Sequence, residues 1–321
     1  MAAFVTIADP ASLIPIAIET LGMSEDVPFD LFFKQVSGQF VLYRAANFPF
    51  HASDLEAMQR RGIRTLYISN GSLAEYEKYL HDQVLTDADA TPTARYCAVR
   101  DVNRSVFLNA LKEKSVGKVL DVASTLAEEL AEVVCNQEAT ICNLFKVMNH
   151  DYYTYTHVTN VCVYALALAQ ELGISDRKEM CELATGALLH DLGKRHIPTE
   201  ILNKKGQLSL EERTLINAHP QTGFAEVCQR EDLTWAQLMM IYQHHERIDG
   251  RGYPAKVAGD EILPWSRLCS IVDVHDALSS YRPYRPPMRT AELCEYFKSL
   301  SGKSFDQEMV KCWISLMQQT N

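Results

Sequence analysis

The pattern of hydrophobic and polar positions divides the chain into two parts. In the first part, apolar residues alternate or form short runs. FDLFFKQ (29–35) and QFVLYRA (39–45) flank a Ser-Gly turn and predict a β-hairpin. SDLEAMQRRG (53–62) starts with an N-cap serine and ends at glycine, which predicts a helix. RTLYIS (64–69) predicts a third strand and SLAEYEKYLHDQVL (72–85) a second helix. These elements predict a small, independent α/β module that contains a βαβ unit.

From about residue 95 to the end, nearly every segment has the helical period. VLDVASTLAEELAEVV (119–134), NVCVYALALAQELG (160–173) and DLTWAQLMMIYQ (232–243) place apolar residues at i, i+3 and i+4. The stretch TDADATPTAR (86–95) is polar and carries a proline, so it is typical of a linker or a helix start. We therefore expect a mainly α protein, in which an all-helical domain follows a small α/β domain. The expected boundaries are 1–90 for the α/β domain, 91–148 for connecting helices and 149–321 for the main helical domain.

Composition and charge exclude several classes of protein. The chain has 321 residues, 47% of them hydrophobic, which fits two globular domains of about 100–200 residues each. Its net charge of −10 argues against non-specific nucleic-acid binding, which needs a basic surface. No apolar run approaches the ~20 residues of a membrane span, and no Lys or Arg precedes the apolar N-terminal segment, unlike a secretory signal. The nine scattered cysteines fit reduced thiols. We expect a cytoplasmic protein.

Histidines and aspartates supply the candidate chemistry. The segment HHERIDGRGYP (244–254) joins two adjacent histidines to a glycine-rich loop, although alone it is also typical of an ordinary turn. Other candidates in helical contexts lie upstream and downstream: His157, His190, Asp191, His219, Asp273 and Asp276. Imidazole and carboxylate ligands suit Fe, Mn, Ni or Zn better than Ca or Mg, and the absence of thiolates argues against a structural zinc site. A lone histidine is more often an ordinary core or surface residue, as we expect for His51, His81, His150, His196 and His275.

Two motifs in this order resemble a known family. HDLGK (190–194) followed by HHERIDGRGYP (244–254) resembles the HD-GYP family, a branch of the HD-domain metal-dependent phosphohydrolases. The resemblance extends through IPTEILNKKGQLSLEERTLINAHPQTG (197–223) and VDVHDALSSYRPYR (272–285), and it covers roughly residues 150–310. The HD pair alone is common, whereas the joint pattern is highly specific.

The resemblance implies a binuclear centre of divalent transition metals, with iron or manganese preferred and nickel or zinc as alternatives. One metal would be held by His157, His190, Asp191 and Asp273, and the other by Asp191, His219, His244 and His245. Two metals about 3.5–4 Å apart suit in-line phosphodiester hydrolysis, because both the attacking and the leaving oxygen are stabilised. Some family members bind a third metal through a glutamate one turn before the His157 position. Tyr153 stands there in this chain, which favours two metals; Asp276 or His150 could add a ligand.

The resemblance also implies a substrate, cyclic di-GMP, hydrolysed to the linear dinucleotide; further hydrolysis to GMP is left open. Asp191 and Lys194 are the expected catalytic residues, and Lys194 would stabilise charge on a phosphate oxygen. Its alternative is a solvated lysine at a helix end. Arg282 and Arg285 match positions that contact substrate phosphates, for which guanidinium groups are well suited; their alternative is a plain basic loop. Asp276 is a further expected substrate contact.

The loop formed by Asp249, Gly250, Gly252, Tyr253 and Pro254 is expected to position the two histidines, and to shape the pocket or a surface for a signalling partner. For Tyr253, packing is favoured over direct chemistry. Two other functions stay open: a cyclic-dinucleotide receptor without turnover, and a phosphodiesterase for a mixed guanine–adenine cyclic dinucleotide. The GYP and RPYR segments disfavour a mononucleotide phosphohydrolase. The N-terminal domain is expected to be regulatory or to dock a partner, and the oligomeric state, a homodimer included, is left open.

Overall fold

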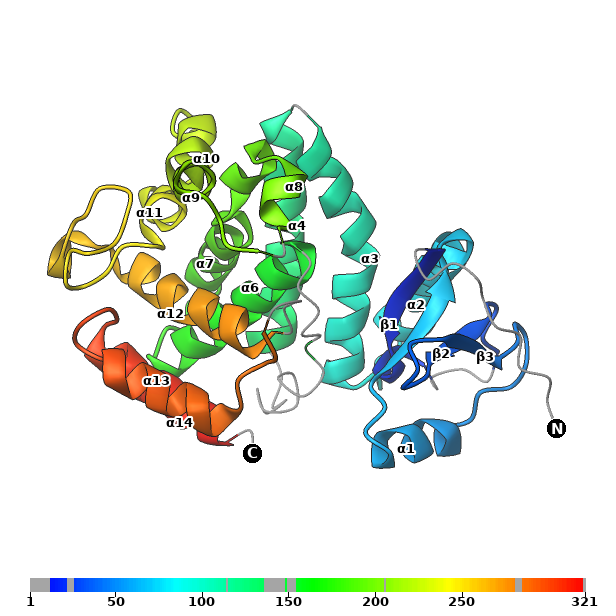
Figure 1. Cartoon of the computed structure of the whole chain (residues 1–321). Coiled ribbons are helices and arrows are strands. Elements are labelled where there is room, and N and C mark those ends of the chain that lie inside the picture. The colour runs from blue at the N-terminus through cyan, green and yellow to red at the C-terminus, as the bar shows by residue number, and fades with distance from the viewer. Residues whose placement is uncertain are drawn as a thin grey trace. The chain divides into compact units, whose positions relative to one another are not determined.

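The computed structural model describes residues 12–21, 26–113, 115–135, 148, 154–204, 206–280 and 285–319. The chain forms two compact units, Met1–Arg104 and Ser105–Asn321. Their division falls inside α3 (Pro92–Lys112), whereas the sequence predicted a domain boundary near residue 90. The expected fold class, a mainly helical protein with a small α/β part at its N-terminus, is confirmed (Figure 1).

The first unit holds a four-stranded antiparallel sheet in the order β1-β4-β2-β3. Its strands are β1 (Leu13–Ala17), β2 (Leu31–Lys34), β3 (Phe40–Arg44) and β4 (Thr65–Ser69). The predicted hairpin and third strand are confirmed as β2, β3 and β4. Because β3 and β4 both run antiparallel to β2, they run parallel to each other, and α1 (Ala52–Arg60) connects them around β2. The predicted βαβ unit is therefore present with a strand between its two parallel members. Strand β1 was not predicted.

The helices of this unit bury its core against the sheet. Besides α1 they are α2 (Leu73–Leu80), which continues as the π-helical segment η4 (His81–Leu85), and the first part of α3. Two short 3-10 turns, η2 (Ile18–Thr20) and η3 (Asn70–Ser72), complete it. Ile16, Leu66 and Ile68 on the strands pack in one buried cluster with Tyr76 of α2 and Ala98 of α3. The alternating burial of β4 shows that its other face is partly exposed.

The second unit is built around α6 (Thr154–Glu171), which is buried from residue 155 to 169. An apolar helix of this kind needs neighbours on all sides. It has them in α4 (Val116–Cys135), α7 (Arg177–Leu189), α12 (Pro264–Ser279) and α14 (Gln307–Gln319), as Figure 1 shows. The remaining elements are η5 (Leu192–His196), α8 (Thr199–Leu202), α9 (Leu210–Asn217), α10 (His219–Val227), α11 (Trp235–Gln243), η6 (Gly259–Glu261) and α13 (Thr290–Leu300).

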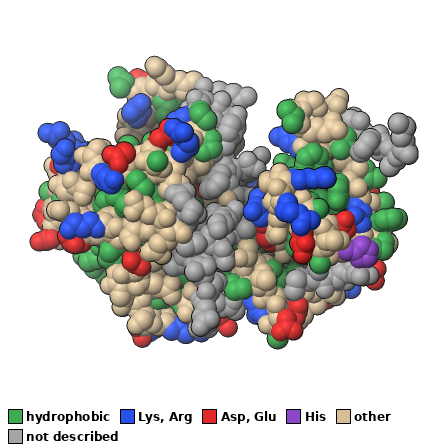
Figure 2. Space-filling view, turned by 90° about the horizontal axis from the view of Figure 1, so that it is seen from below, with side chains coloured by type: hydrophobic (Ala, Val, Ile, Leu, Met, Phe, Trp, Pro, Cys, Tyr) green, Lys and Arg blue, Asp and Glu red, His purple; other side chains and the backbone are tan. Residues whose placement is uncertain are grey.

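On the face drawn in Figure 2, the Lys and Arg side chains are interspersed with Asp and Glu. Among the helices that the structure describes, none combines the length and the apolar character that crossing a membrane requires.

Candidate metal centre

The predicted metal ligands come together in the helical unit as two adjoining groups. Asp191, His219, His244 and His245 offer ligand atoms within 4.8 Å of one another, and His157, His190 and Asp273 form a second such group. They come from the inside of α6, the C-terminal end of α7, the start of α10, the end of α11 and the middle of α12. All are buried except His245, whose side chain is 22% exposed.

Asp191 lies between the two groups. Its Oδ2 is 3.4 Å from Nε2 of both His157 and His190. Its Oδ1 is 3.2 Å from Nε2 of His219 and 3.8 Å from Nε2 of His244. One carboxylate oxygen therefore faces each group, which is the arrangement that a bridging ligand requires.

A close backbone approach brings Asp191 to His219. Helix α7 ends at Leu189, and the chain turns through His190 and Asp191 into the 3-10 turn η5. A Cβ atom at Gly193 would lie 2.0 Å from the backbone oxygen of His219, so only glycine lets η5 pack against the start of α10. Pro220 lies in the first turn of α10, where its missing N–H costs nothing.

Backbone carbonyls fix the orientation of three imidazoles. The Nδ1 groups of His190, His219 and His244 lie 2.7, 2.7 and 3.0 Å from the carbonyl oxygens of Ala187, Ile216 and Ile241. Since a carbonyl only accepts, we assign the proton to each Nδ1, which leaves a lone pair on Nε2. The Nε2 atoms of His219 and His244 then face each other across 3.1 Å. Two lone pairs at this distance repel unless a cation lies beside them, so the donor set fits a bound metal.

Asp276 supports His157. Its Oδ2 accepts a hydrogen bond from Nδ1 of His157 at 2.7 Å, and its Oδ1 accepts one from Nδ2 of Asn160, also at 2.7 Å. The sequence predicted that Asp276 contacts substrate, but the structure places its carboxylate in the interior with 1% of the residue exposed. A carboxylate behind a metal-binding histidine fixes the ring and raises its basicity. Asn160, which the sequence reasoning missed, lies three residues after His157 and so on the same face of α6.

The electrostatics favour the ligand forms of Asp191, Asp273, His244 and His245. For His157, burial lowers the pKa, but hydrogen bonds with Asp191, Asp273 and Asp276 outweigh it and raise that pKa well above its usual value in the metal-free chain. Burial alone would raise the pKa of Asp191, but the charge of Lys194 holds that pKa well below its usual range. Asp273 behaves similarly, because its contacts with His157 and His245 outweigh burial and lower its pKa. Burial lowers the pKa of His244, and it lowers the pKa of His245 to about 3. Ionised carboxylates and neutral imidazoles at neutral pH are the forms that bind metals.

The structure describes only some of the predicted substrate contacts. Lys194 lies beside the centre, with Nζ 2.5 Å from Oδ2 of Asp191 and 17% of its side chain exposed. The guanidinium of Arg285 donates to the backbone oxygens of Ala277 and Leu278 at the end of α12, at 2.8 and 3.1 Å. Arg282, Tyr153 and His150 lie outside the described residues. For the arginines, a phosphate contact stays a prediction.

The loop after the two histidines packs directly on them. The Tyr253 N–H donates to the His245 carbonyl at 3.2 Å, and the Tyr253 ring lies 4.7 Å from the His245 ring at an interplanar angle of 31°. A Cβ at Gly252 would lie 2.6 Å from the same carbonyl. Gly250 has a φ of +71°, and Asp249 accepts hydrogen bonds from Arg247 and from the Arg251 N–H. Pro254 follows Tyr253 and is partly buried.

The histidines that were expected to be ordinary residues lie outside both groups where the structure describes them. His275 is buried against Tyr164 and Trp313, and His196 pairs with Glu226. His51 and His81 are exposed in the first unit.

Comparison with known proteins also relates the chain to the HD domain family. The HD domain family matches residues 121–309. The chain is 31% identical over 213 residues to the cyclic di-GMP phosphodiesterase PA4108 of Pseudomonas aeruginosa, covering 66% of this chain and 51% of that protein. It is 39% identical over 137 residues to the 3'3'-cGAMP-specific phosphodiesterase 3 of Vibrio cholerae, covering 42% and 29%. The chain thus spans about half the length of the first of these relatives and less of the second.

The fold has a counterpart among solved structures. Bd1817, a HDG"Y"P protein from Bdellovibrio bacteriovorus, superposes with a TM-score of 0.67 at 21% identity, over 95% of this chain and 99% of that one. At this identity the likeness concerns the fold.

Proposed function

The chain belongs to the HD domain family and carries both motifs of its HD-GYP branch, and from this premise we propose that it hydrolyses cyclic di-GMP at a binuclear metal centre. The observation that carries the proposal is the position of Asp191, which turns one oxygen to each group of histidines. Relatives at 31% identity are named cyclic di-GMP phosphodiesterases, which supports the choice of substrate.

Each residue of the centre has a role in this proposal. Bound metals supply Lewis-acid stabilisation of phosphate oxygens and a nucleophilic water near neutral pH. Asp191 would be a ligand of both metals, and the histidines and Asp273 would supply the remaining protein ligands. Lys194 sets an ammonium beside the centre, where it neutralises charge that develops on a phosphate oxygen. The proposed product is the linear dinucleotide, with further hydrolysis to GMP as the alternative.

An Asp191→Asn variant tests the proposal. The substitution keeps the size of the side chain but removes the charge that would bridge the metals, so we expect metal content to fall below two per chain and cyclic di-GMP hydrolysis to be lost. The assay uses protein purified anaerobically and loaded with Fe²⁺ or Mn²⁺, with separation of nucleotide products. Asp232→Asn is the control, because Asp232 is exposed and pairs with Arg230. Hydrolysis at the wild-type rate by Asp191→Asn would refute the mechanism, and tight binding without product by the wild type would favour a receptor.

A mixed guanine–adenine cyclic dinucleotide is the second candidate substrate. The 39% identity to a 3'3'-cGAMP-specific phosphodiesterase supports it. Comparing kcat/KM for cyclic di-GMP and 3'3'-cGAMP on the same loaded protein decides between them.

We further propose iron or manganese as the native metal, with nickel and zinc as alternatives, because the donors are imidazoles and carboxylates without a thiolate. A cytoplasmic location is supported by the eight described cysteines, which are all free thiols, as a reducing compartment would keep them. The first unit is proposed as a regulatory or docking domain.

A further inference from the structure

Two side chains that flank the histidine pair hold the loop that follows it. Glu246, directly after His245, accepts hydrogen bonds through Oε1 from the N–H groups of Ala255 and Lys256, at 2.6 and 2.9 Å. Gln243, directly before His244, donates to the Glu261 carbonyl at 3.1 Å and accepts from the Leu263 N–H at 3.0 Å. In the sequence QHHE (243–246), the two inner residues are the proposed metal ligands, and the two outer residues hold the loop by hydrogen bonds.

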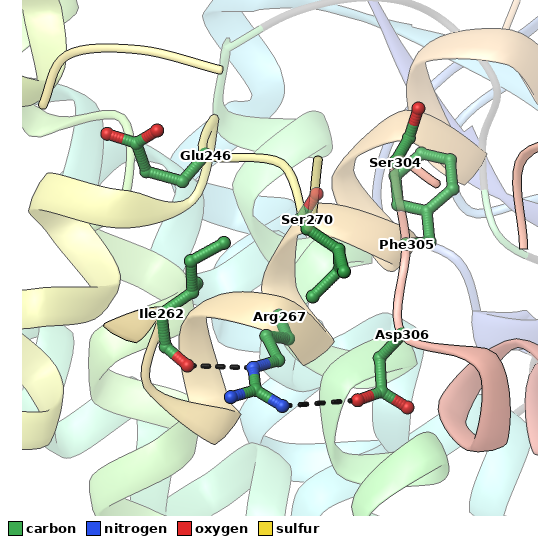
Figure 3. Close-up of a pocket in the computed structure, with 8 residues that line it drawn as sticks. Glu246, Ile262, Arg267, Ser270, Ser304, Phe305 and Asp306 are labelled. Atoms are coloured by element: carbon green, nitrogen blue, oxygen red, sulfur yellow. Dashed lines mark hydrogen bonds and ion pairs between the residues drawn. The ribbon is translucent and has the colours of Figure 1, made fainter. Parts of the chain in front are cut away.

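The Glu246 carboxylate is committed to the loop backbone. Glu246 is 2% exposed and lines a small hollow together with Arg267, Ser270 and Ser304. In Figure 3 its side chain points away from Arg267. The guanidinium of Arg267 instead donates hydrogen bonds to the Ile262 carbonyl at 2.7 Å, to Asp260 at 3.0 Å and to Asp306 at 3.3 Å. An ionised acceptor on two backbone N–H groups makes stronger hydrogen bonds than a neutral one.

The loop in turn lies against His245. The backbone of Gly252 leaves no room for a Cβ, which would lie 2.4 Å from the Glu246 Cα, and the Tyr253 ring packs on the His245 ring. Within the described residues, His190, His219 and His244 are each held by a backbone carbonyl, whereas the His245 imidazole has no such bond. His245 is also the most exposed of the ligands. Its orientation therefore depends on the loop more than that of the other histidines does.

We propose that Glu246 is a positioning residue that fastens the loop against His245 and so sets the metal affinity of the group formed by Asp191, His219, His244 and His245. Glu246 has no direct contact with the group formed by His157, His190 and Asp273, so the metal affinity of that group should change less. The inference rests on the binuclear centre proposed above. It adds that the loop affects the binding affinity of one of the two metals.

Titration of the full-length, metal-free chain with Mn²⁺ tests it, with metal analysis and electron paramagnetic resonance as readouts. The wild type should bind two ions and give the spectrum of a coupled pair. Glu246→Ala should keep one ion and bind the other about 10–100-fold more weakly. The spectrum of its remaining ion should match that of His219→Ala, which lacks a ligand of the affected group, and not that of His190→Ala.

Two matched variants separate positioning from simple loss of packing. Glu246→Gln keeps an acceptor oxygen for the loop and should restore most of the affinity. Ser304→Ala removes a buried hydroxyl that lines the same hollow and has no hydrogen-bond partner among the described residues, so it should bind two ions like the wild type. Where Glu246→Ala does not fold, Gly252→Ala displaces the loop from the other side and should show the same selective loss.

Two Mn²⁺ ions bound by Glu246→Ala with wild-type affinities would overturn the inference, as would equal weakening of both ions. A wild type that binds fewer than two ions would instead overturn the binuclear centre, so the two failures are distinguishable.

Discussion

At the scale of single residues, the centre depends on groups that bind no metal themselves. Three histidines donate from Nδ1 to backbone carbonyls, and His157 donates to Asp276. Each bond fixes a ring and leaves Nε2 as the ligand atom. Loss of such a partner is therefore expected to weaken a metal site while its ligands stay in the sequence.

Asp276→Ala tests this expectation directly, because it removes the hydrogen-bond acceptor of His157. We expect this substitution to lower the affinity of the group with His157, His190 and Asp273 for Mn²⁺ by about 10–100-fold, because His157 loses its acceptor. Mn²⁺ titration and the KM for cyclic di-GMP are measured together. Ser279→Ala, one turn further along α12, is the control. Unchanged metal binding with a raised KM would contradict the supporting role and favour the substrate contact that the sequence predicted.

The sequence predicted which residues would form the centre better than how they are held. The ligands could be identified because the resemblance to the HD-GYP family covers their positions both inside and outside the two motifs, and the structure gathers all of them. Asn160 and Glu246 could not be identified, since a carboxylate or an amide has no pattern of its own until the fold brings a partner to it. Asp276 was noticed, but its direction depends on the packing of α12 against α6, which spacing along one helix does not determine.

At the scale of elements, the ends of helices carry the chemistry. His190, His244 and His245 follow the last residues of α7 and α11, and His219 opens α10. The helical period predicted α6 and α11 near these sites, because apolar residues recur at i, i+3 and i+4 in 160–173 and 232–243. Strand β1 was missed for a different reason. Its short sequence LIPIA has no alternation, and its pairing with β4, more than 40 residues away, is what makes it a strand.

The end of α12 gives a prediction at this scale. Arg285 donates two hydrogen bonds to the last carbonyls of the helix that carries Asp273 and Asp276. We expect Arg285→Ala to lower the free energy of unfolding by about 1–2 kcal/mol, because charged hydrogen bonds to these carbonyls are lost. Chemical denaturation measures the change, with Arg289→Ala, an exposed arginine paired with Glu292, as the control. Unchanged stability with a raised KM would show that Arg285 serves the substrate alone.

At the scale of the whole molecule, a negatively charged protein needs local positive charge at the site where it binds an anionic substrate. The chain carries a net charge of −10, and its proposed substrate is an anion. Two divalent cations and Lys194 would outweigh the carboxylates of Asp191, Asp273 and Asp276, so the centre would attract an anion only when it is loaded. In the proposed mechanism, bound metal would therefore serve both the chemistry and the capture of the substrate.

The loaded centre should also bind the helical unit together, because its ligands come from α6, α7, α10, α11 and α12. A metal at 100 times its Kd adds about 2.7 kcal/mol of stability. We therefore expect chelation to lower Tm and to speed hydrogen exchange at the ligand-bearing ends of these helices. The amides of β2 and β4 should exchange as before, since every ligand lies in the unit Ser105–Asn321. Asp191→Asn protein should respond to the chelator much less. Equal exchange with and without metal in the wild type would mean that the five helices hold the pocket without the cations.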